Sequence, residues 1–285
     1  MDEPPSDRTG SPGPPETPLG GAIVVGVASG FLAGLFGVGG GILIVPGLVF
    51  LGMRQRRAHG TSLAAIIPIA ASGIVGFWLE GSVDWPVAAV VTIGAASGAL
   101  LGTSALQRLE GRALRIGFAV LLLATAARLF LEIPDRTGRA DLEIPLIIGL
   151  LCAGLFAGGV AGLFGVGGGV VIVPALVILF SIPDPVAKGT SLVVILPAAL
   201  VGTARNARYG NLDLRAAVAV GVSGVVSAFL ASKLAIRMDP RLSAVLFAAL
   251  LVAVTARLLI VERERTIAKR EGRWPPPEEE PEISP

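Results

Sequence analysis

Apolar residues along the chain gather into ten segments separated by glycine, proline and charged residues. Eight segments approach or exceed the ~18 to 20 residues that cross a hydrocarbon core of about 30 Å as a helix. The pattern therefore predicts an all-α polytopic membrane protein with eight full transmembrane helices plus two short segments. The ten segments cover residues 20–37, 41–52, 60–79, 86–106, 113–131, 144–165, 169–181, 189–207, 213–236 and 240–260.

The two short segments, 41–52 and 169–181, directly follow runs of glycine. A helix of about 12 residues reaches only about 18 Å, which is less than the thickness of the hydrocarbon core. We therefore expect half-length helices, re-entrant arms, or short spans extended by polar flanks.

The chain contains an internal duplication. The tract AGLFGVGGGILIVP, Ala33 to Pro46, recurs as AGLFGVGGGVVIVP, Ala161 to Pro174, 128 residues later. A shift of 129 residues carries GTSL at Gly60 onto GTSL at Gly189, and Asp84 onto Asp213. Such self-similarity predicts two equivalent structural units, which we name the first and the second copy. We expect a disordered N-terminal tail over 1–19, the first transmembrane repeat over 20–132, a polar connector over 133–143, the second repeat over 144–261 and a disordered C-terminal tail over 262–285.

Composition supports a membrane protein and excludes several other classes. With 53% hydrophobic and 15% charged residues, the 285-residue chain has too little polar surface for a water-facing globule. A net charge of +2 is too small to indicate nucleic acid as a partner. Cys152 and His59 are the only residues of their types, so no disulfide framework or metal cluster is expected. We find no nucleophile–base pair or cofactor motif, and the chain is not expected to be an enzyme.

Lysine and arginine in short loops concentrate on the cytoplasmic side, so their placement tests the topology. If the short segments do not cross, each side carries ten basic residues and no orientation follows. If they cross, one side carries 14 and the other six. The larger set is Arg54, Arg56, Arg57, Arg108, Arg112, Arg115, Arg205, Arg208, Arg215 and five tail residues; the smaller is Arg136, Arg139, Lys188, Lys233, Arg237 and Arg241.

This bias favours ten crossings, five per copy, with both termini in the cytoplasm. An odd number of crossings per copy makes the second copy enter the membrane in the opposite orientation. Such 5+5 inverted repeats, with broken helices meeting near the midplane, are the usual architecture of secondary transporters.

The glycine tracts predict an anion site. Glycine lets the chain unwind and expose backbone N–H groups, which is tolerated at membrane depth only when they are buried in protein or line a wet cavity. A helix restarting at Ile42 or Val170 would direct its free N–H groups and positive dipole end at that cavity. The inverted arrangement would make the two tracts one anion site. A nucleotide-binding loop is disfavoured because no strand–helix unit surrounds the tract. Packing alone is the other reading, and it is favoured for the ridges Gly26–Gly30–Gly34 and Gly94–Gly98–Gly102.

The GTSL tracts supply hydroxyl groups in both copies. Thr61, Ser62, Thr190 and Ser191 lie where helices are expected to begin, so they could cap the first N–H groups. Alternatively, they line the substrate path, and Pro68 and Pro197 kink each helix and free further carbonyl groups.

One place breaks the symmetry of the two copies: Gly76 and Phe77 of the first correspond to Arg205 and Asn206 of the second. Arg205 lies near a helix end and could simply extend to the membrane interface. Alternatively, it is a cation at the inner mouth of an anion pathway. We find no acidic residue within an expected span that could couple transport to protons.

The motif G-x-x-A-G-L-F-G-V-G-G-G-x-x-x-V-P, followed by A-x-G-T-S-L and a glycine–aspartate turn, resembles the sulfite exporter TauE/SafE family of prokaryotic membrane proteins. The resemblance spans about residues 20 to 260. It implies a plasma-membrane transporter of sulfur-containing anions such as sulfite or organosulfonates. The positions matching the motif are Gly39, Gly40, Gly41, Pro46, Gly60, Thr61 and Ser62, with Gly167, Gly168, Gly169, Pro174, Gly189, Thr190 and Ser191.

The sequence therefore predicts a bilayer protein that exports sulfite or organosulfonates by alternating access. An anion channel, an uptake carrier for another small anion and a non-transporting membrane scaffold remain as alternatives. The candidate substrate-binding residues are Gly39, Gly40, Gly41, Pro46, Thr61, Ser62, Gly167, Gly168, Gly169, Pro174, Thr190, Ser191, Arg205 and Asn206.

Overall fold

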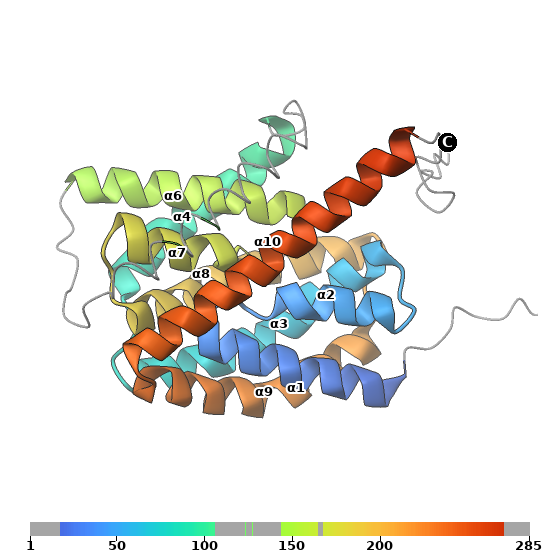
Figure 1. Cartoon of the computed structure of the whole chain (residues 1–285), viewed down its shortest axis with the longest axis horizontal. Coiled ribbons are helices and arrows are strands. Elements are labelled where there is room, and N and C mark those ends of the chain that lie inside the picture. The colour runs from blue at the N-terminus through green and yellow to red at the C-terminus, as the bar shows by residue number, and fades with distance from the viewer. Residues whose placement is uncertain (1–17, 106–122, 124–126, 128–143, 165–167, 271–285) are drawn as a thin grey trace, which may run out of the picture.

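The computed structural model describes residues 18–105, 123, 127, 144–164 and 168–270, and the described part is helical without strands (Figure 1). The first copy contributes α1 (Leu19–Phe36), α2 (Gly41–Phe50), α3 (Gln55–Trp78) and α4 (Trp85–Ala105). The second contributes α6 (Ile144–Phe164), α7 (Gly169–Leu179), α8 (Asp184–Arg208), α9 (Leu214–Arg237) and α10 (Pro240–Arg270).

Four helices within the described residues are long and apolar enough to cross a membrane: α1, α3, α8 and α9. The helices α4 and α6 have 21 residues each, and α2 and α7 are short, as the glycine tracts predict. The expected span at 113–131 lies outside the described residues apart from Leu123 and Ala127, as do the connector at 133–143 and nearly all of the N-terminal tail.

Helix α1 lies along α9, a helix of the other copy (Figure 1). The three glycines of the first ridge make this close approach possible. A Cβ atom at Gly26, Gly30 or Gly34 would overlap the backbone carbonyl oxygens of Val220, Gly224 and Ala228, respectively. The predicted role of this ridge in helix packing is therefore confirmed.

The same contact recurs between α4 and α6 (Figure 1). A Cβ at Gly94 or Gly98 of α4 would overlap the carbonyl oxygens of Leu151 and Leu155 of α6. Conversely, Gly158 of α6 packs on the carbonyl oxygen of Ala95. Because α6 corresponds to α1 and α4 to α9, each copy supplies its first helix to the other copy.

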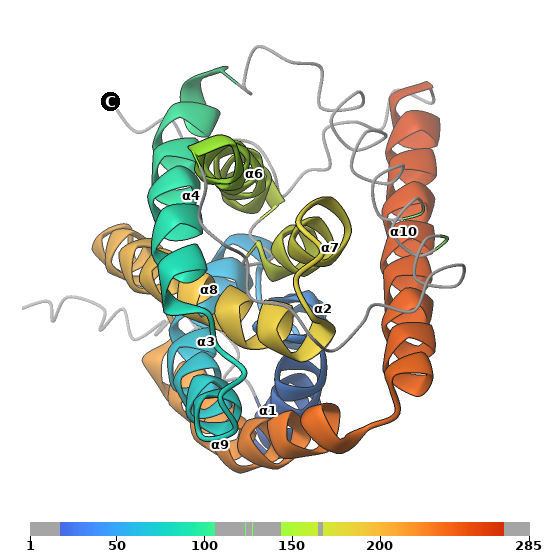
Figure 2. The ribbon, with the colours of Figure 1, turned by 90° about the vertical axis from the view of Figure 1, so that its left-hand side faces the viewer.

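Helices α3 and α8 pack against each other at the centre, in opposite directions (Figure 2). The start of α8, at Gly189, lies against Phe77 near the end of α3. The start of α3, at Gly60, lies against Asn206 near the end of α8. The 129-residue shift relates both members of these pairs, so equivalent positions make equivalent contacts.

Helix α10 stands to one side of the other described helices (Figure 2). It continues to Arg270, whereas the sequence prediction ended the second repeat at 261 and assigned 262–285 to a disordered tail. The prediction used the onset of charged residues as a boundary. Because glutamate, arginine, lysine and alanine are good helix formers, charge alone does not end a helix that has already begun. Residues 271–285 lie outside the described part of the chain.

Candidate functional site at the glycine breaks

The first glycine break separates α1 from α2. Gly37 ends α1 in the left-handed conformation, with φ +70° and its N–H bonded to the carbonyl of Ala33 at 2.8 Å. Gly39 and Gly40 also have positive φ, +74° and +77°, which side-chain-bearing residues rarely adopt. The N–H groups of Leu43 and Ile44 bond to the carbonyl of Gly40 at 3.0 and 3.1 Å. The N–H groups before them have no acceptor within α2.

The second glycine break repeats this geometry at the start of α7. Gly168 has φ +74°, and its carbonyl accepts from Val171 and Ile172 at 3.0 Å each. Gly167 lies outside the described residues. Pro46 and Pro174 occupy the same place in α2 and α7, where each proline lacks the N–H that would bond the carbonyl four residues earlier. Each short helix thus begins and continues in the same way.

The two breaks contact each other. A Cβ at Gly169 would lie 2.7 Å from Cα of Val38 and 2.9 Å from the carbonyl oxygen of Gly37. A Cβ at Gly39 would lie 3.2 Å from Ile195 of α8 and 3.7 Å from Ile66 of α3. The two isoleucines are equivalent residues of the two copies. The start of α7, the first break and both central helices therefore meet at one place.

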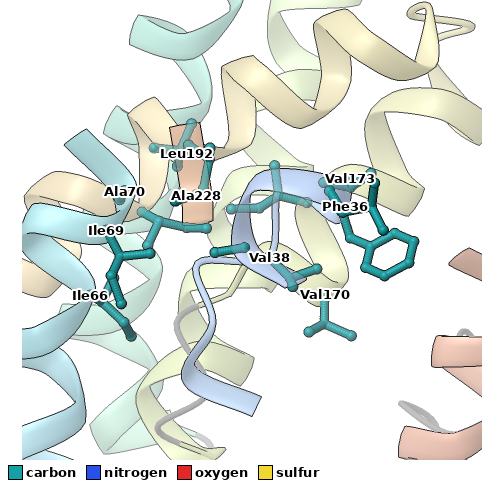
Figure 3. Packing of buried hydrophobic residues seen from close by; sticks show 14 of the residues in the cluster. Phe36, Val38, Ile66, Ile69, Ala70, Val170, Val173, Leu192 and Ala228 are labelled. Atoms are coloured by element: carbon teal, nitrogen blue, oxygen red, sulfur yellow. The ribbon is translucent and has the colours of Figure 1, made fainter. Parts of the chain in front are cut away.

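Apolar side chains fill this meeting point. Val38 is 1% exposed and lies among Ile66, Ile69, Val170 and Leu192 (Figure 3). The described glycines Gly39, Gly40 and Gly168 are themselves buried in this conformation.

Thr61 and Thr190 tie the copies together. The hydroxyl of Thr61 accepts from the backbone N–H of Asp213 at 2.9 Å, and the hydroxyl of Thr190 accepts from the N–H of Asp84 at 3.0 Å. Both threonines are fully buried, and the two aspartates cap α9 and α4 by accepting from Ala216 and Val87. Each threonine therefore holds the start of a helix that belongs to the other copy.

The expectation that these hydroxyls cap α3 and α8 is wrong. The two helices begin at Gln55 and Asp184, five residues before Gly60 and Gly189, so the hydroxyls lie inside the helices. The glycines preceding them permit a close approach, because a Cβ at Gly60 or Gly189 would overlap the carbonyl oxygen of Asn211 or Ser82. These two oxygens again occupy equivalent positions in the copies.

Ser62 and Ser191 differ in their partners. Ser191 is fully buried and donates to the carbonyl of Gly37, with Lys188 O also within 2.9 Å of its hydroxyl. Ser62 is equally buried, but its hydroxyl has no hydrogen-bond partner among the described residues. One serine thus joins α8 to the first glycine break, and the other leaves a buried polar atom free for a further partner.

Arg205 and Asn206 do not reach the glycine breaks. Arg205 is exposed in the last turn of α8, and no described contact joins it to either break. Asn206 donates to the carbonyl of Gly202 at 2.9 Å and lies against Gly60. Asn206 therefore serves the contact between α3 and α8.

Sequence reasoning missed Lys188, which it assigned to a loop. The side chain is completely buried within α8, and its ammonium contacts a carboxylate oxygen of Asp184 at 2.7 Å. The signal was present in the duplication, because the residue before Gly60 in the first copy is His59, so both copies place a basic or titratable side chain immediately before GTSL. Where the start of α3 lies beside the end of α8, Arg57 pairs with Asp213 at 3.2 Å, and both side chains are partly exposed.

The described residues contain no group of three histidine, cysteine, aspartate or glutamate side chains that could hold a metal ion. They contain instead a buried region where the start of α7, the first glycine break, the hydroxyl group of Ser191 and Lys188 lie together. This arrangement, within long apolar helices, is typical of helical membrane transporters.

The comparisons with known proteins identify the family. The model of the family "Sulfite exporter TauE/SafE" matches residues 4–129 and 150–282, and the chain belongs to this family of membrane transporters, which are not enzymes. Among its relatives is the probable membrane transporter protein YunE of Bacillus subtilis, 27% identical over 223 residues, covering 70% of this chain and 81% of the relative. A probable membrane transporter protein of Xylella fastidiosa strain 9a5c is 30% identical over 227 residues, covering 76% and 87%. The probable membrane transporter protein MJ0441 of Methanocaldococcus jannaschii is 29% identical over 243 residues, covering 78% and 86%.

Proposed function

We propose that this protein exports small sulfur-containing anions, sulfite or organosulfonates, across a prokaryotic plasma membrane by alternating access. The observation that carries the proposal is the contact between the two glycine breaks, at Gly169, Val38 and Gly37. It places the start of α7 against the first glycine break inside the protein, so that one anion could be bound by elements of both copies.

The chemistry of the breaks suits an anion. The first N–H groups of a helix have no internal acceptor, and the helix dipole favours negative charge at that end. Gly40 and Gly168 have no side chain to cover these N–H groups. The remaining substrate-binding candidates would complete the site: Gly39, Gly41, Gly167 and Gly169 in the backbone, Pro46 and Pro174 beside it, and the hydroxyls of Thr61, Ser62, Thr190 and Ser191. Arg205 and Asn206 are not included, because they lie away from the breaks.

Five crossings per copy in inverted orientation fit the reciprocal contacts. The antiparallel packing of α3 on α8 and the paired hydrogen bonds of Thr61 and Thr190 are what an axis in the membrane plane would produce. Both termini then lie in the cytoplasm. If the two copies exchanged their conformations, the glycine breaks would open first to one face of the membrane and then to the other.

Transport is tested with purified protein in proteoliposomes loaded with labelled sulfite, an organosulfonate or thiosulfate. We expect saturable flux from the wild type and its loss in Gly40→Leu and Gly168→Leu. Gly210→Leu is the matched control, because Gly210 also has a positive φ, +69°, but a Cβ there meets open space. Equal loss in all three variants would attribute the effect to backbone strain and count against the site.

The other outcomes distinguish the alternatives. Currents that follow the membrane potential without saturable exchange would identify an anion channel. Saturable accumulation of a different anion, without sulfite or sulfonate flux, would identify an uptake carrier. If no anion is transported, the proposal is wrong, and a non-transporting membrane scaffold is the remaining alternative.

Orientation is tested with single cysteines in a Cys152→Ala background. Arg56 and Ser181 are exposed residues before the GTSL tracts of the first and the second copy. Inverted copies predict that impermeant thiol reagents label Arg56→Cys and Ser181→Cys from opposite faces. Labelling from the same face would exclude the inverted arrangement without bearing on transport itself.

A further inference from the structure

Lys188 lies in a closed polar cluster between α8, α1 and α10. Its ammonium donates to the hydroxyl of Ser243 at 2.7 Å and contacts Oδ2 of Asp184 at 2.7 Å. The hydroxyl of Ser243 in turn donates to the same carboxylate oxygen at 2.9 Å. The rings of Phe36 and Phe247, stacked with centroids 5.5 Å apart, have their centroids 5.8 and 5.9 Å from the ammonium.

This cluster adjoins the first glycine break. A Cβ at Gly37 would lie 2.6 Å from both Cα and the carbonyl oxygen of Lys188, so the break rests directly on the lysine backbone. One turn further along α8, Ser191 donates to the carbonyl of Gly37. The most completely buried cation in the described residues is therefore attached to the segment that we propose binds the anion.

The complete burial of the charged Lys188 side chain is energetically unfavourable and suggests a functional role. Ionisable side chains inside a membrane protein are costly to bury, and replacing a buried ion pair by apolar residues is often neutral or stabilising. The Lys188–Asp184 pair is also incompletely satisfied, because Oδ1 of Asp184 is buried without a hydrogen-bond partner. The first copy has Gln55 and His59 at the equivalent positions, so the pair is not part of the frame common to both copies.

We propose that Lys188 takes the charge of the transported anion and that Asp184 is the counter-ion that the anion displaces. The inference rests on the proposed function and assigns the cation of that site. In the closed conformation Asp184 neutralises Lys188. When the glycine breaks open, a small oxyanion replaces the carboxylate as the partner of the ammonium. The ligand class is an oxyanion compact enough to reach an ammonium that lies beside two stacked phenylalanine rings.

The test compares labelled sulfite flux from proteoliposomes, with protein-free vesicles as the baseline. We expect Lys188→Met to lower flux at least about tenfold, the effect of losing one hydrogen bond to a charged group. Lys233→Met is the matched control. Lys233 pairs with Glu80 at 2.6 Å and lies 5.7 Å from the ring of Phe229, but it is partly exposed and belongs to α9. Its replacement should leave flux within about twofold of the wild type.

Because Lys188→Met leaves Asp184 buried and unpaired, the variant could fail to fold. The double variant Lys188→Met/Asp184→Asn removes both charges and restores neutrality. If Lys188 binds the anion, the double variant folds and still lacks flux. If it regains wild-type flux, the pair is merely structural and the inference is overturned.

Asp184→Asn tests the counter-ion. This variant should retain sulfite flux and reach half-maximal flux at a lower sulfite concentration than the wild type, because no carboxylate competes with the anion for the ammonium. A half-maximal concentration equal to or above that of the wild type would overturn the assignment of Asp184. Absence of flux in the wild type would instead defeat the proposed function.

Discussion

The starts of α3 and α8 are equivalent in sequence and in place, yet they carry different charges. Both contain a threonine hydroxyl that accepts from an aspartate N–H of the other copy, and both contain a glycine pressed against a carbonyl oxygen. Near the start of α3, Arg57 pairs with Asp213, and both side chains are partly exposed. Near the start of α8, Lys188 is buried and pairs with Asp184 of its own helix, whereas the first copy has His59 at the position of Lys188.

The comparison separates two kinds of interaction. Contacts that occur in both copies hold the copies together, because each involves one residue of the first and one of the second. Interactions that occur in only one copy have no symmetric counterpart, and they can serve a step of transport that has a direction. Substitutions at the starts of α3 and α8 can therefore distinguish the contacts common to both copies from the Lys188–Asp184 pair, which only the second copy has.

The largest expected difference is between the two basic residues. Lys188→Met leaves Asp184 buried without its cation and should lower the free energy of unfolding by about 3 to 5 kcal/mol. Arg57→Met removes a partly exposed pair and should cost about 0 to 1 kcal/mol. Thermal unfolding in detergent, followed by size-exclusion chromatography, measures both. Equal losses of stability would contradict the difference expected between the buried Lys188–Asp184 pair and the partly exposed Arg57–Asp213 pair.

The paired glycines should respond alike. Gly60→Val and Gly189→Val place a side chain where a carbonyl oxygen of the other copy lies, and each should destabilise by about 1 to 3 kcal/mol. The control is Gly20→Val, because Gly20 is helical and a Cβ there meets open space. Gly81 and Gly210 are also unobstructed, but their positive φ would add backbone strain. A shift in melting temperature at only one of the two positions would contradict an equivalent frame.

The threonines should give a smaller, equal effect. Thr61→Val and Thr190→Val keep the shape of the side chain but leave the N–H of Asp213 or Asp84 without its acceptor, at a cost of about 1 to 2 kcal/mol each. Thr61→Ser and Thr190→Ser retain the hydroxyl and should recover most of the stability. If the serine and valine variants have equal melting temperatures, the methyl group contributes as much to stability as the hydrogen bond, and the expected dominance of the hydrogen bond is wrong.

The smallest effect concerns the surface pair of Glu80 and Lys233. The hydrogen bond and charge of Lys233 hold the pKa of Glu80 below its usual value of 4.5. Because the folded-state pKa is lowered, the pair stabilises the protein above pH 4.5, and this contribution is lost as the pH falls through the folded-state value. Melting temperatures of the wild type and Glu80→Gln should differ slightly at neutral pH and converge in acid. A difference that persists in acid would show that the pair does not act through charge.

Local patterns of small and apolar residues predicted much of the fold. The ridge at Gly26, Gly30 and Gly34 pointed to close helix packing, and the structure confirms it, because small residues at this spacing leave a groove for another backbone. The short helices after the glycine tracts are also present. Contact between the tracts is observed, whereas their binding of an anion stays a prediction.

Interactions between distant residues could not be predicted in this way. The starts of α3 and α8 were placed too late because Arg57 and Lys188 resembled loop residues. Arg57 pairs with Asp213, which is distant in sequence, and Lys188 bonds to Ser243 of another helix in addition to Asp184 of its own. Ser243, which bonds Lys188, comes 55 residues later. Arg205, in contrast, attracted attention by breaking the symmetry, but helix geometry places it on the exposed side of α8. Charge pattern alone does not reveal which cation is buried.

The packing of α1 on α9 has a consequence for the synthesis of the protein. The glycine face of α1 is made early, but Val220, Gly224 and Ala228, which cover it, are synthesised 194 residues after the glycines that they contact. Helix α1 must therefore wait in the membrane, without its final neighbour, until α9 has been inserted. Lipid or an insertion factor has to occupy that face in the meantime, and a chain released before α9 is made would leave the glycine face of α1 uncovered.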